Sequence, residues 1–145
     1  STRYHMKNYI GIDISKATID VYDGKKSYKF DNTTDGFKSV VSLSEDITNT
    51  ILIFEPTGIY SYGLSAFCAK NKIKVVMVGP KESRDFARSL KVRSKTDKID
   101  AKVLYRYQSH VETKMVKVPV INHQAVKVQE MLNAYESLQE SKQKF

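Results

Sequence analysis

Four acidic residues occupy positions at which carboxylates commonly carry out chemistry in α/β proteins. Asp13 ends the first predicted strand and Glu55 ends the fourth, and functional groups gather at the C-terminal ends of parallel strands. Asp97 and Asp100 lie three residues apart in a helix predicted to begin near Thr96, a spacing that places both on one helix face. If this helix packs across the strand ends, all four carboxylates converge.

Converging carboxylates favour a site for divalent metal ions. Their mutual repulsion must be neutralised, and carboxylate oxygens are ligands that Mg²⁺ and Mn²⁺ prefer. Two such ions about 4 Å apart can act on both the attacking and the leaving oxygen of a phosphodiester. We therefore expect Mg²⁺ or Mn²⁺, as two ions, with Asp13, Glu55, Asp97 and Asp100 as the candidate metal-binding and catalytic residues.

Each acid taken alone also has an ordinary structural interpretation. Asp13 could be a turn or cap residue, and Glu55 follows an apolar strand, where a carboxylate is costly without a partner. Asp97 could interact with the helix dipole, and Asp100 could pair with neighbouring lysines on a solvated face. The prediction of a metal site therefore depends on the set of four.

Positive charge is concentrated around two of these acids. The chain contains 24 Lys and Arg against 16 Asp and Glu, a formal net charge of +8. Residues 81–117 alone hold eleven basic and five acidic residues, a net +6 that surrounds Asp97 and Asp100. This block favours contacts with phosphates, with a solvated basic face as the alternative. The candidate nucleic-acid contacts are Lys16 (which could instead occupy a turn), Arg84, Arg88, Lys91, Arg93, Lys95 and Lys98.

Length and composition exclude several other classes of protein. The 145 residues suffice for one domain with a core, and 41% hydrophobic and 28% charged residues are ordinary globular usage. The apolar runs are far shorter than the roughly 18 residues that span a membrane. Cys68 is the single cysteine, which excludes an internal disulfide or a multi-cysteine zinc site, and we expect it to be a core residue. We expect a cytoplasmic protein without a membrane partner.

The hydrophobic pattern predicts an α/β fold with a mixed five-stranded sheet and helices on both of its faces. Strands one, four and five are expected to be parallel, because helices separate them in the sequence. The predicted strands are Asn8–Ile14, Ala17–Tyr22, Ser27–Phe30, Thr50–Glu55 and Ile73–Val78. The predicted helices are Gly36–Glu45, Ile59–Lys70, Lys81–Leu90 and, after a basic linker at Lys91–Lys95, Thr96 to about His110.

The last part of the chain differs in composition from the rest. His123–Lys144 contains no Gly or Pro, and apolar positions recur every three or four residues at Val128, Met131, Tyr135 and Leu138, a spacing that Lys142 continues. We expect residues 119–145 to be the start of a helical extension that could form a coiled coil, cut from a longer protein. We expect residues 6–118 to form the catalytic domain and residues 1–5 to be a cloning remnant.

Four sequence segments, in this order, resemble a known family. They are Ile10–Val21 (IGIDISKATIDV), Phe54–Tyr60 (FEPTGIY), Val78–Pro80 before a helix, and Ser89–Ala101 (SLKVRSKTDKIDA). Together they are similar to the N-terminal catalytic domain of the DEDD transposases, a group that includes the Piv and MooV DNA invertases and many bacterial insertion-sequence transposases. The similarity covers Met6 to about His110, and it departs from the family at Gly79, where relatives commonly have Asn.

The resemblance implies a RuvC-like, RNase H-type fold in which Asp13, Glu55, Asp97 and Asp100 are the metal-binding DEDD tetrad. It implies a bacterial enzyme that cuts and rejoins DNA in transposition or inversion, with a structured guide RNA from the same element as a further partner. A serine in a C-terminal domain is proposed as nucleophile in such enzymes, and it is not assigned in this chain. The helical segment after the tetrad can support self-association there, so we expect a homodimer or higher oligomer.

Two other functions remain open from the sequence. The GxDxSK pattern of Gly11–Lys16 also resembles the phosphate loop of actin-like and sugar-kinase ATP-binding lobes, but such enzymes need a second lobe and do not explain the basic block. A non-catalytic nucleic-acid-binding module would use the acids as caps and ion pairs. That alternative predicts binding without any need for metal.

Overall fold

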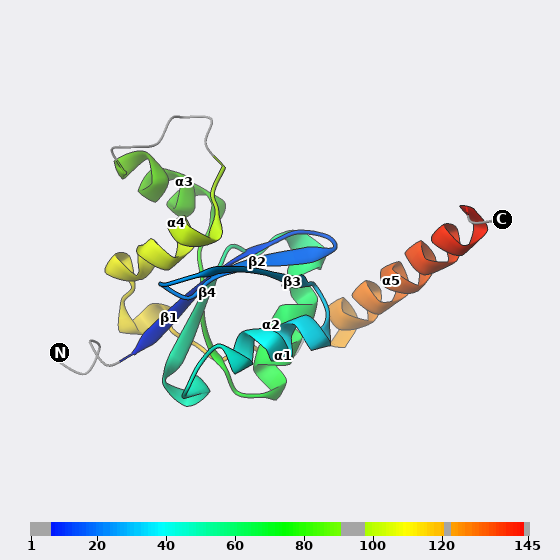
Figure 1. Ribbon diagram of the computed structural model, residues 1–145, viewed down its shortest axis with the longest axis horizontal. Coiled ribbons are helices and arrows are strands. Elements are labelled where there is room, and N and C mark those ends of the chain that lie inside the picture. Colours follow the sequence, from blue (N-terminus) through cyan, green and yellow to red (C-terminus); the bar gives the residue numbers. More distant parts are fainter. Residues whose placement is uncertain (1–6, 91–97, 121–122, 144–145) are drawn as a thin grey trace.

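A five-stranded mixed sheet forms the centre of the molecule. The computed structural model describes residues 7–90, 98–120 and 123–143, with the strands in the order β3-β2-β1-β4-β5 (Figure 1). Strand β1 pairs antiparallel with β2 and parallel with β4, and β4 pairs parallel with β5. The strands are β1 (Asn8–Ile14), β2 (Thr18–Tyr22), β3 (Ser27–Asp31), β4 (Thr50–Phe54) and β5 (Lys74–Met77). The mixed sheet with three parallel strands confirms the predicted fold class.

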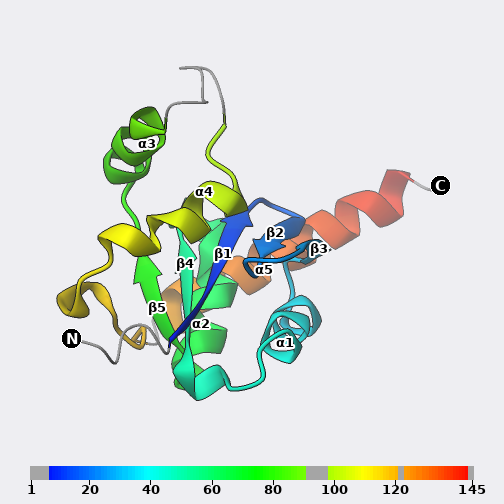
Figure 2. The same ribbon diagram turned by 60° about the vertical axis from the view of Figure 1, so that its left-hand side comes forward.

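Helices cover both faces of this sheet, as predicted for an RNase H-like fold (Figures 1 and 2). Helices α1 and α2 pack on one face through Phe37 and Leu64, and α3 and α4 pack on the other through Phe86 and Leu104. The helices are α1 (Thr34–Ser42), α2 (Tyr62–Lys70), α3 (Pro80–Ser89), α4 (Ala101–Arg106) and α5 (His123–Gln143). Single 3₁₀ turns occupy Ile47–Asn49, Gly58–Ser61, Tyr107–His110 and Thr113–Met115.

The alternation of side chains along β1 and β4 creates the two cores. Ile10 and Ile12 face α1 and α2, whereas Tyr9 faces α3 and α4. All five residues of β4 are buried, because this strand lies between two parallel neighbours and beneath helices on both sides. The prediction of a strand buried on both faces, drawn from the continuous apolar run, is therefore confirmed.

The predicted helix from Thr96 to about His110 starts later than predicted and ends as a 3₁₀ turn. Residues 98–100 are not helical, α4 begins at Ala101, and it gives way to a 3₁₀ turn at Tyr107–His110. Asp100 is the N-cap, and its carboxylate accepts a hydrogen bond from the Val103 backbone N–H at 2.9 Å. Aspartate is among the preferred N-cap residues, so Asp100 suits a helix that begins at Ala101. Asp100 therefore precedes the helix instead of lying within it, and the prediction that it lies on a helix face is wrong.

The remaining helix boundaries shift by a few residues. The helix predicted at Gly36–Glu45 is α1, which starts after the N-cap Thr33. The helix predicted from Ile59 begins as a 3₁₀ turn before α2. The predicted C-terminal helix is confirmed as α5, which contacts α2 and the Gly58–Ser61 turn before extending away from the sheet (Figure 1). Within the described ranges, no helix is both long and apolar enough to cross a bilayer.

Candidate metal and nucleic-acid site

Asp13 and Glu55 lie on neighbouring strands at the same end of the sheet. Ile12 of β1 pairs with Phe54 of β4, so each acid directly follows a residue of the last parallel pair. Alternation places both acids on the sheet face under α3 and α4, because Tyr9 and Ile53 belong to the core on that face. This is the proximity that the strand-end argument predicted for these two acids.

Gly11 brings the start of α4 close to Asp13. A Cβ atom at Gly11 would collide with the carbonyl oxygen of Ala101 and the backbone nitrogen of Tyr105, so only a glycine permits this approach. Gly11 is two residues before Asp13, and Ala101 directly follows Asp100. This role of Gly11 was not predicted. A glycine inside an apolar strand does, however, indicate close contact with another segment of backbone.

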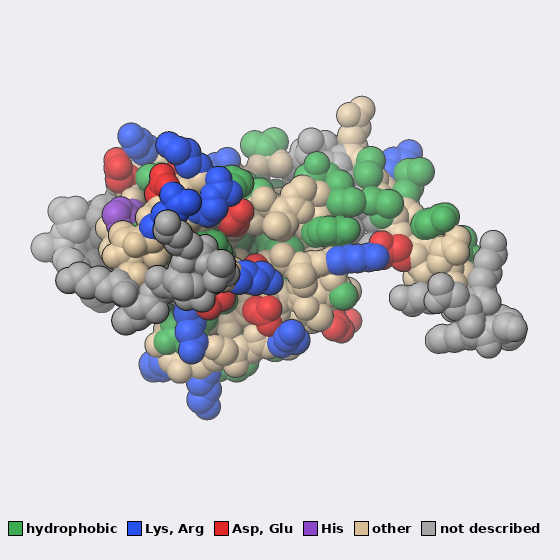
Figure 3. Space-filling view, turned by 90° about the horizontal axis from the view of Figure 1, so that it is seen from above, with side chains coloured by type: hydrophobic (Ala, Val, Ile, Leu, Met, Phe, Trp, Pro, Cys, Tyr) green, Lys and Arg blue, Asp and Glu red, His purple; other side chains and the backbone are tan. Residues whose placement is uncertain are grey.

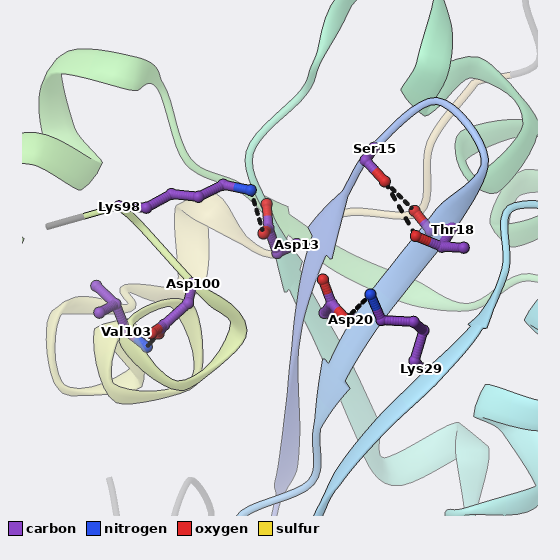
Figure 4. A network of polar contacts seen from close by, with 8 residues as sticks. All are labelled: Asp13, Ser15, Thr18, Asp20, Lys29, Lys98, Asp100 and Val103. Carbon is purple, nitrogen blue, oxygen red and sulfur yellow. Dashed lines mark hydrogen bonds and ion pairs between the residues drawn. The ribbon is translucent and has the colours of Figure 1, made fainter.

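Asp13 and Asp100 line one cavity of about 420 Å³. Asp20 lines the same cavity, since β2 pairs Asp20 directly with Asp13, and it forms an ion pair of 3.6 Å with Lys29 on β3 (Figure 4). Asp20 was not a candidate from the sequence. The register of β1 and β2 places Asp20 opposite Asp13, and predicting a hairpin from the sequence does not determine that register.

Lys98 provides a positive charge at Asp13. Its ammonium Nζ lies 3.5 Å from Oδ2 of Asp13, and it reaches the carboxylate from the segment that precedes α4 (Figure 4). Burial raises the pKa of Asp13, and the Lys98 ammonium opposes that rise, while Asp20 and Asp100 add to it. Asp13 is therefore a partly desolvated carboxylate in an acidic neighbourhood, and a cation stabilises its charged form.

Ser83 on α3 contacts the carboxylate of Glu55. The buried hydroxyl of Ser83, on α3, donates to Oε2 of Glu55 at 2.9 Å and also lies 3.0 Å from the Pro80 carbonyl oxygen. Glu55 is in turn only partly exposed, so this contact restricts its orientation. Ser83 was not predicted as a site residue. Its position on the inner face of the amphipathic helix α3 is the one sequence feature that indicates a buried contact.

The described part of the site provides oxygen ligands suited to a hard cation. Asp13 and Asp100 share the cavity, Glu55 lies on the same sheet face as Asp13, and the ammonium of Lys98 lies beside Asp13. Asp97 lies outside the described residues. Within those residues, no three His, Cys, Asp or Glu side chains are close enough to hold one metal ion. The complete four-carboxylate site accordingly stays a prediction.

The candidate phosphate contacts fall into three groups. Arg84 and Arg88 are exposed one turn apart on α3, and Lys and Arg side chains gather over α3 and α4 (Figure 3). Lys16 forms an ion pair of 2.9 Å with Glu136 of α5, and Lys98 pairs with Asp13. The last group, Lys91, Arg93 and Lys95, lies outside the described residues.

Comparison with known proteins identifies relatives along most of this chain. A family model for DEDD transposases, described as a transposase, matches residues 10–144. The pilin gene-inverting proteins of Moraxella bovis and Moraxella lacunata are each 37% identical over 109 residues, which is 70% of this chain and 34% of the relative. The chain thus spans about a third of the length of these curated relatives.

Proposed function

The chain belongs to the DEDD transposase family, and on this basis we propose that it is the catalytic part of a DNA recombinase that uses divalent metal ions to cleave and join DNA strands. The two relatives are named for inverting a pilin gene. For this chain we propose a DNA rearrangement of the same general kind, inversion or transposition of a DNA segment.

The observation that carries this proposal is the placement of Asp13 and Glu55. Both follow the last paired residues of adjacent parallel strands on one sheet face, and Asp100 lines a cavity with Asp13. Carboxylates brought together on a rigid sheet end are suited to holding Mg²⁺ or Mn²⁺. Asp13, Glu55, Asp97 and Asp100 are the proposed ligands of two ions.

Bound divalent ions would stabilise the charges on the attacking and leaving oxygens of the DNA phosphodiester. The chain's own residues orient the ligands. Strands β1 and β4 fix the spacing of Asp13 and Glu55, Ser83 orients the Glu55 carboxylate, and the close contact at Gly11 fixes the start of α4. Arg84, Arg88, Lys91, Arg93 and Lys95 are proposed to hold the DNA backbone around these acids.

The proposal extends to the partners of the whole protein. DNA is the proposed substrate, a structured guide RNA is a proposed second partner, and a dimer or higher oligomer is the proposed assembly in the bacterial cytoplasm. The basic side chains over α3 and α4 support binding of nucleic acid, because phosphate contacts depend on such charge (Figure 3).

A non-catalytic nucleic-acid-binding module is the second candidate function. The observation that favours it is that each described acid of the tetrad has a partner within the chain: Lys98 for Asp13, Ser83 for Glu55 and the Val103 backbone for Asp100. Carboxylates with structural partners of this kind do not require metal.

Thermal unfolding with and without Mn²⁺ distinguishes the two candidates. A metal site predicts that Mn²⁺ raises the Tm of the chain, and that Asp13→Asn abolishes this rise. Asp20→Asn is the matched control, because it removes the same charge from the same cavity outside the proposed tetrad. It should retain most of the rise. A Tm that Mn²⁺ leaves unchanged, or an equal rise in Asp13→Asn, would favour the non-catalytic module.

A further inference from the structure

Lys98 and Asp13 form an asymmetric ion pair. The Asp13 side chain is 19% exposed, whereas the Lys98 side chain is 79% exposed and enters from solvent (Figure 4). The ammonium therefore neutralises a largely enclosed carboxylate while most of its own stem lies in water. Such a pair can dissociate by a rotation of the lysine side chain, without any movement of the sheet.

A divalent ion at Asp13 would compete with the ammonium of Lys98 for the same carboxylate. Two cations at one carboxylate repel each other, and this repulsion is strong in a partly desolvated site. Ion pairs with an exposed partner are weak, whereas direct coordination of a doubly charged ion is stronger. Metal binding would therefore release the ammonium of Lys98.

The backbone of Lys98 keeps the released ammonium near the site. Lys98 is two residues before Asp100, whose carboxylate caps α4, and the close approach at Gly11 anchors the first residue of that helix. A lysine side chain anchored at this point can reach anions that lie close to Asp13. When DNA occupies the site, the nearest anion that arrives with it is a backbone phosphate.

We propose that Lys98 is an exchangeable counter-ion of the site: it neutralises Asp13 before metal binds, and metal binding frees its ammonium to contact a DNA phosphate. The inference rests on the proposed metal-dependent function. It assigns Lys98 a substrate contact that exists only in the metal-bound state, unlike the constant phosphate contacts proposed for Arg84 and Arg88 on α3.

Lys102 provides a control in the same cavity. It lines the cavity with Asp13, and its ammonium lies over the ring of Tyr22, 5.7 Å from the ring centroid. Lys102→Gln therefore removes one positive charge near Asp13 and leaves the Lys98–Asp13 pair in place. If the loss of one positive charge near the site changes metal affinity by itself, Lys98→Gln and Lys102→Gln should both show that change.

The first experiment measures Mn²⁺ affinity by isothermal titration calorimetry of the 145-residue chain. Lys98→Gln should bind Mn²⁺ about two- to five-fold more tightly than Lys102→Gln, the range expected for losing a competing exposed ion pair. Lys98→Arg should stay close to the wild type, because it keeps the competing cation. Equal affinities of Lys98→Gln and Lys102→Gln would overturn the exchange.

The Asp13→Asn variant separates this inference from the proposed function. If Asp13→Asn binds Mn²⁺ as the wild type does, both the metal site and the exchange are overturned. If Asp13→Asn loses Mn²⁺ binding but Lys98→Gln binds Mn²⁺ no more tightly than Lys102→Gln, only the exchange is overturned. The proposed metal-dependent function then stands.

The second experiment measures the salt dependence of binding to a DNA duplex, with and without Mn²⁺. With Mn²⁺, Lys98→Gln should reduce the slope of log K against log salt by about 0.9, the value for one lost phosphate contact. Without Mn²⁺, its slope should equal that of the wild type, because the ammonium is held by Asp13. A reduced slope in both conditions, or in neither, would overturn the metal-dependent contact.

Discussion

The hydroxyl of Ser83 is the contact that orients Glu55. Ser83→Ala should lower the free energy of unfolding by about 1 kcal/mol, the usual net effect of one hydrogen bond, and should weaken Mn²⁺ binding because the Glu55 carboxylate is no longer held. Denaturant unfolding and calorimetry measure the two effects.

Ser89→Ala is the matched control. The Ser89 hydroxyl lies on the same helix and, among the contacts described, donates a hydrogen bond only to the Phe86 carbonyl oxygen. Equal Mn²⁺ affinity in both variants would contradict the role of Ser83.

Cys68 is expected to be inert in the folded protein. Cys68 lies on the buried side of α2, where its thiol is completely enclosed, and burial raises the pKa of the thiol to about 12. Because the reactive thiolate is scarce far below the pKa, a thiol reagent should not label Cys68 between pH 7 and 9 unless the chain unfolds. Mass spectrometry after labelling, with and without denaturant, checks this expectation. Rapid labelling of the native chain would contradict the burial of Cys68.

At the scale of single residues, the sequence predicts where Asp13 and Glu55 lie in the sheet but not which side chains contact them. Asp13 and Glu55 were recognisable because each follows an apolar strand, and alternation then determines the sheet face. Their contacts with Lys98 and Ser83 come from segments 85 and 28 residues away in the chain. No local pattern specifies such pairs, because they depend on how helices pack against the sheet.

At the scale of elements, the packing of α4 on β1 determines where Asp100 lies. Gly11→Ala should destabilise the chain by about 1–3 kcal/mol, because the new methyl group meets the backbone of α4 and forces the helix away from the strand. The same variant should weaken Mn²⁺ binding by moving Asp100 from Asp13. Denaturant unfolding and calorimetry provide both measurements.

Gly63→Ala is the control for this substitution. A methyl group at Gly63, on α2, would lie 3.5 Å from the Phe37 ring, an ordinary packing distance, and Ala suits a helix better than Gly. Gly63→Ala should leave stability unchanged or increase it by up to about 1 kcal/mol. A Gly11→Ala chain as stable as the wild type would contradict the close contact between α4 and β1.

The strands were predictable and the start of α4 was not, for a physical reason. Alternating or continuous apolar runs specify strands locally, and the observed bounds of β1 match the predicted bounds. Thr96 and Asp100 are both acceptable N-cap residues, so local preference cannot choose between them. Packing at Gly11 favours a helix that begins at Ala101, and that contact involves a residue 90 positions earlier.

At the scale of the whole molecule, α5 presents an apolar stripe to solvent. Val128, Met131, Tyr135 and Leu138 are 45–63% exposed on the helix that extends from the sheet (Figures 1 and 3). Their spacing of three or four residues places them on one side of α5. The proposed oligomer would bury this stripe between two copies of the chain.

Sedimentation velocity tests this assembly directly. Met131→Glu with Leu138→Glu should weaken self-association about ten-fold or more, because two charges would lie in an apolar contact. Ser137→Glu is the control, since residue 137 is exposed and lies on the opposite side of α5 from Val128. A wild-type chain that is monomeric at all concentrations, or equal effects of both changes, would contradict the role of the stripe.

Manganese anomalous diffraction from crystals of this chain soaked in Mn²⁺ would show whether the four acids hold metal ions. We expect anomalous peaks bounded by the carboxylates of Asp13, Glu55, Asp97 and Asp100, with the ammonium of Lys98 withdrawn from Asp13. Well-ordered carboxylates without anomalous peaks between them, or a tetrad whose members lie too far apart to share ions, would contradict it.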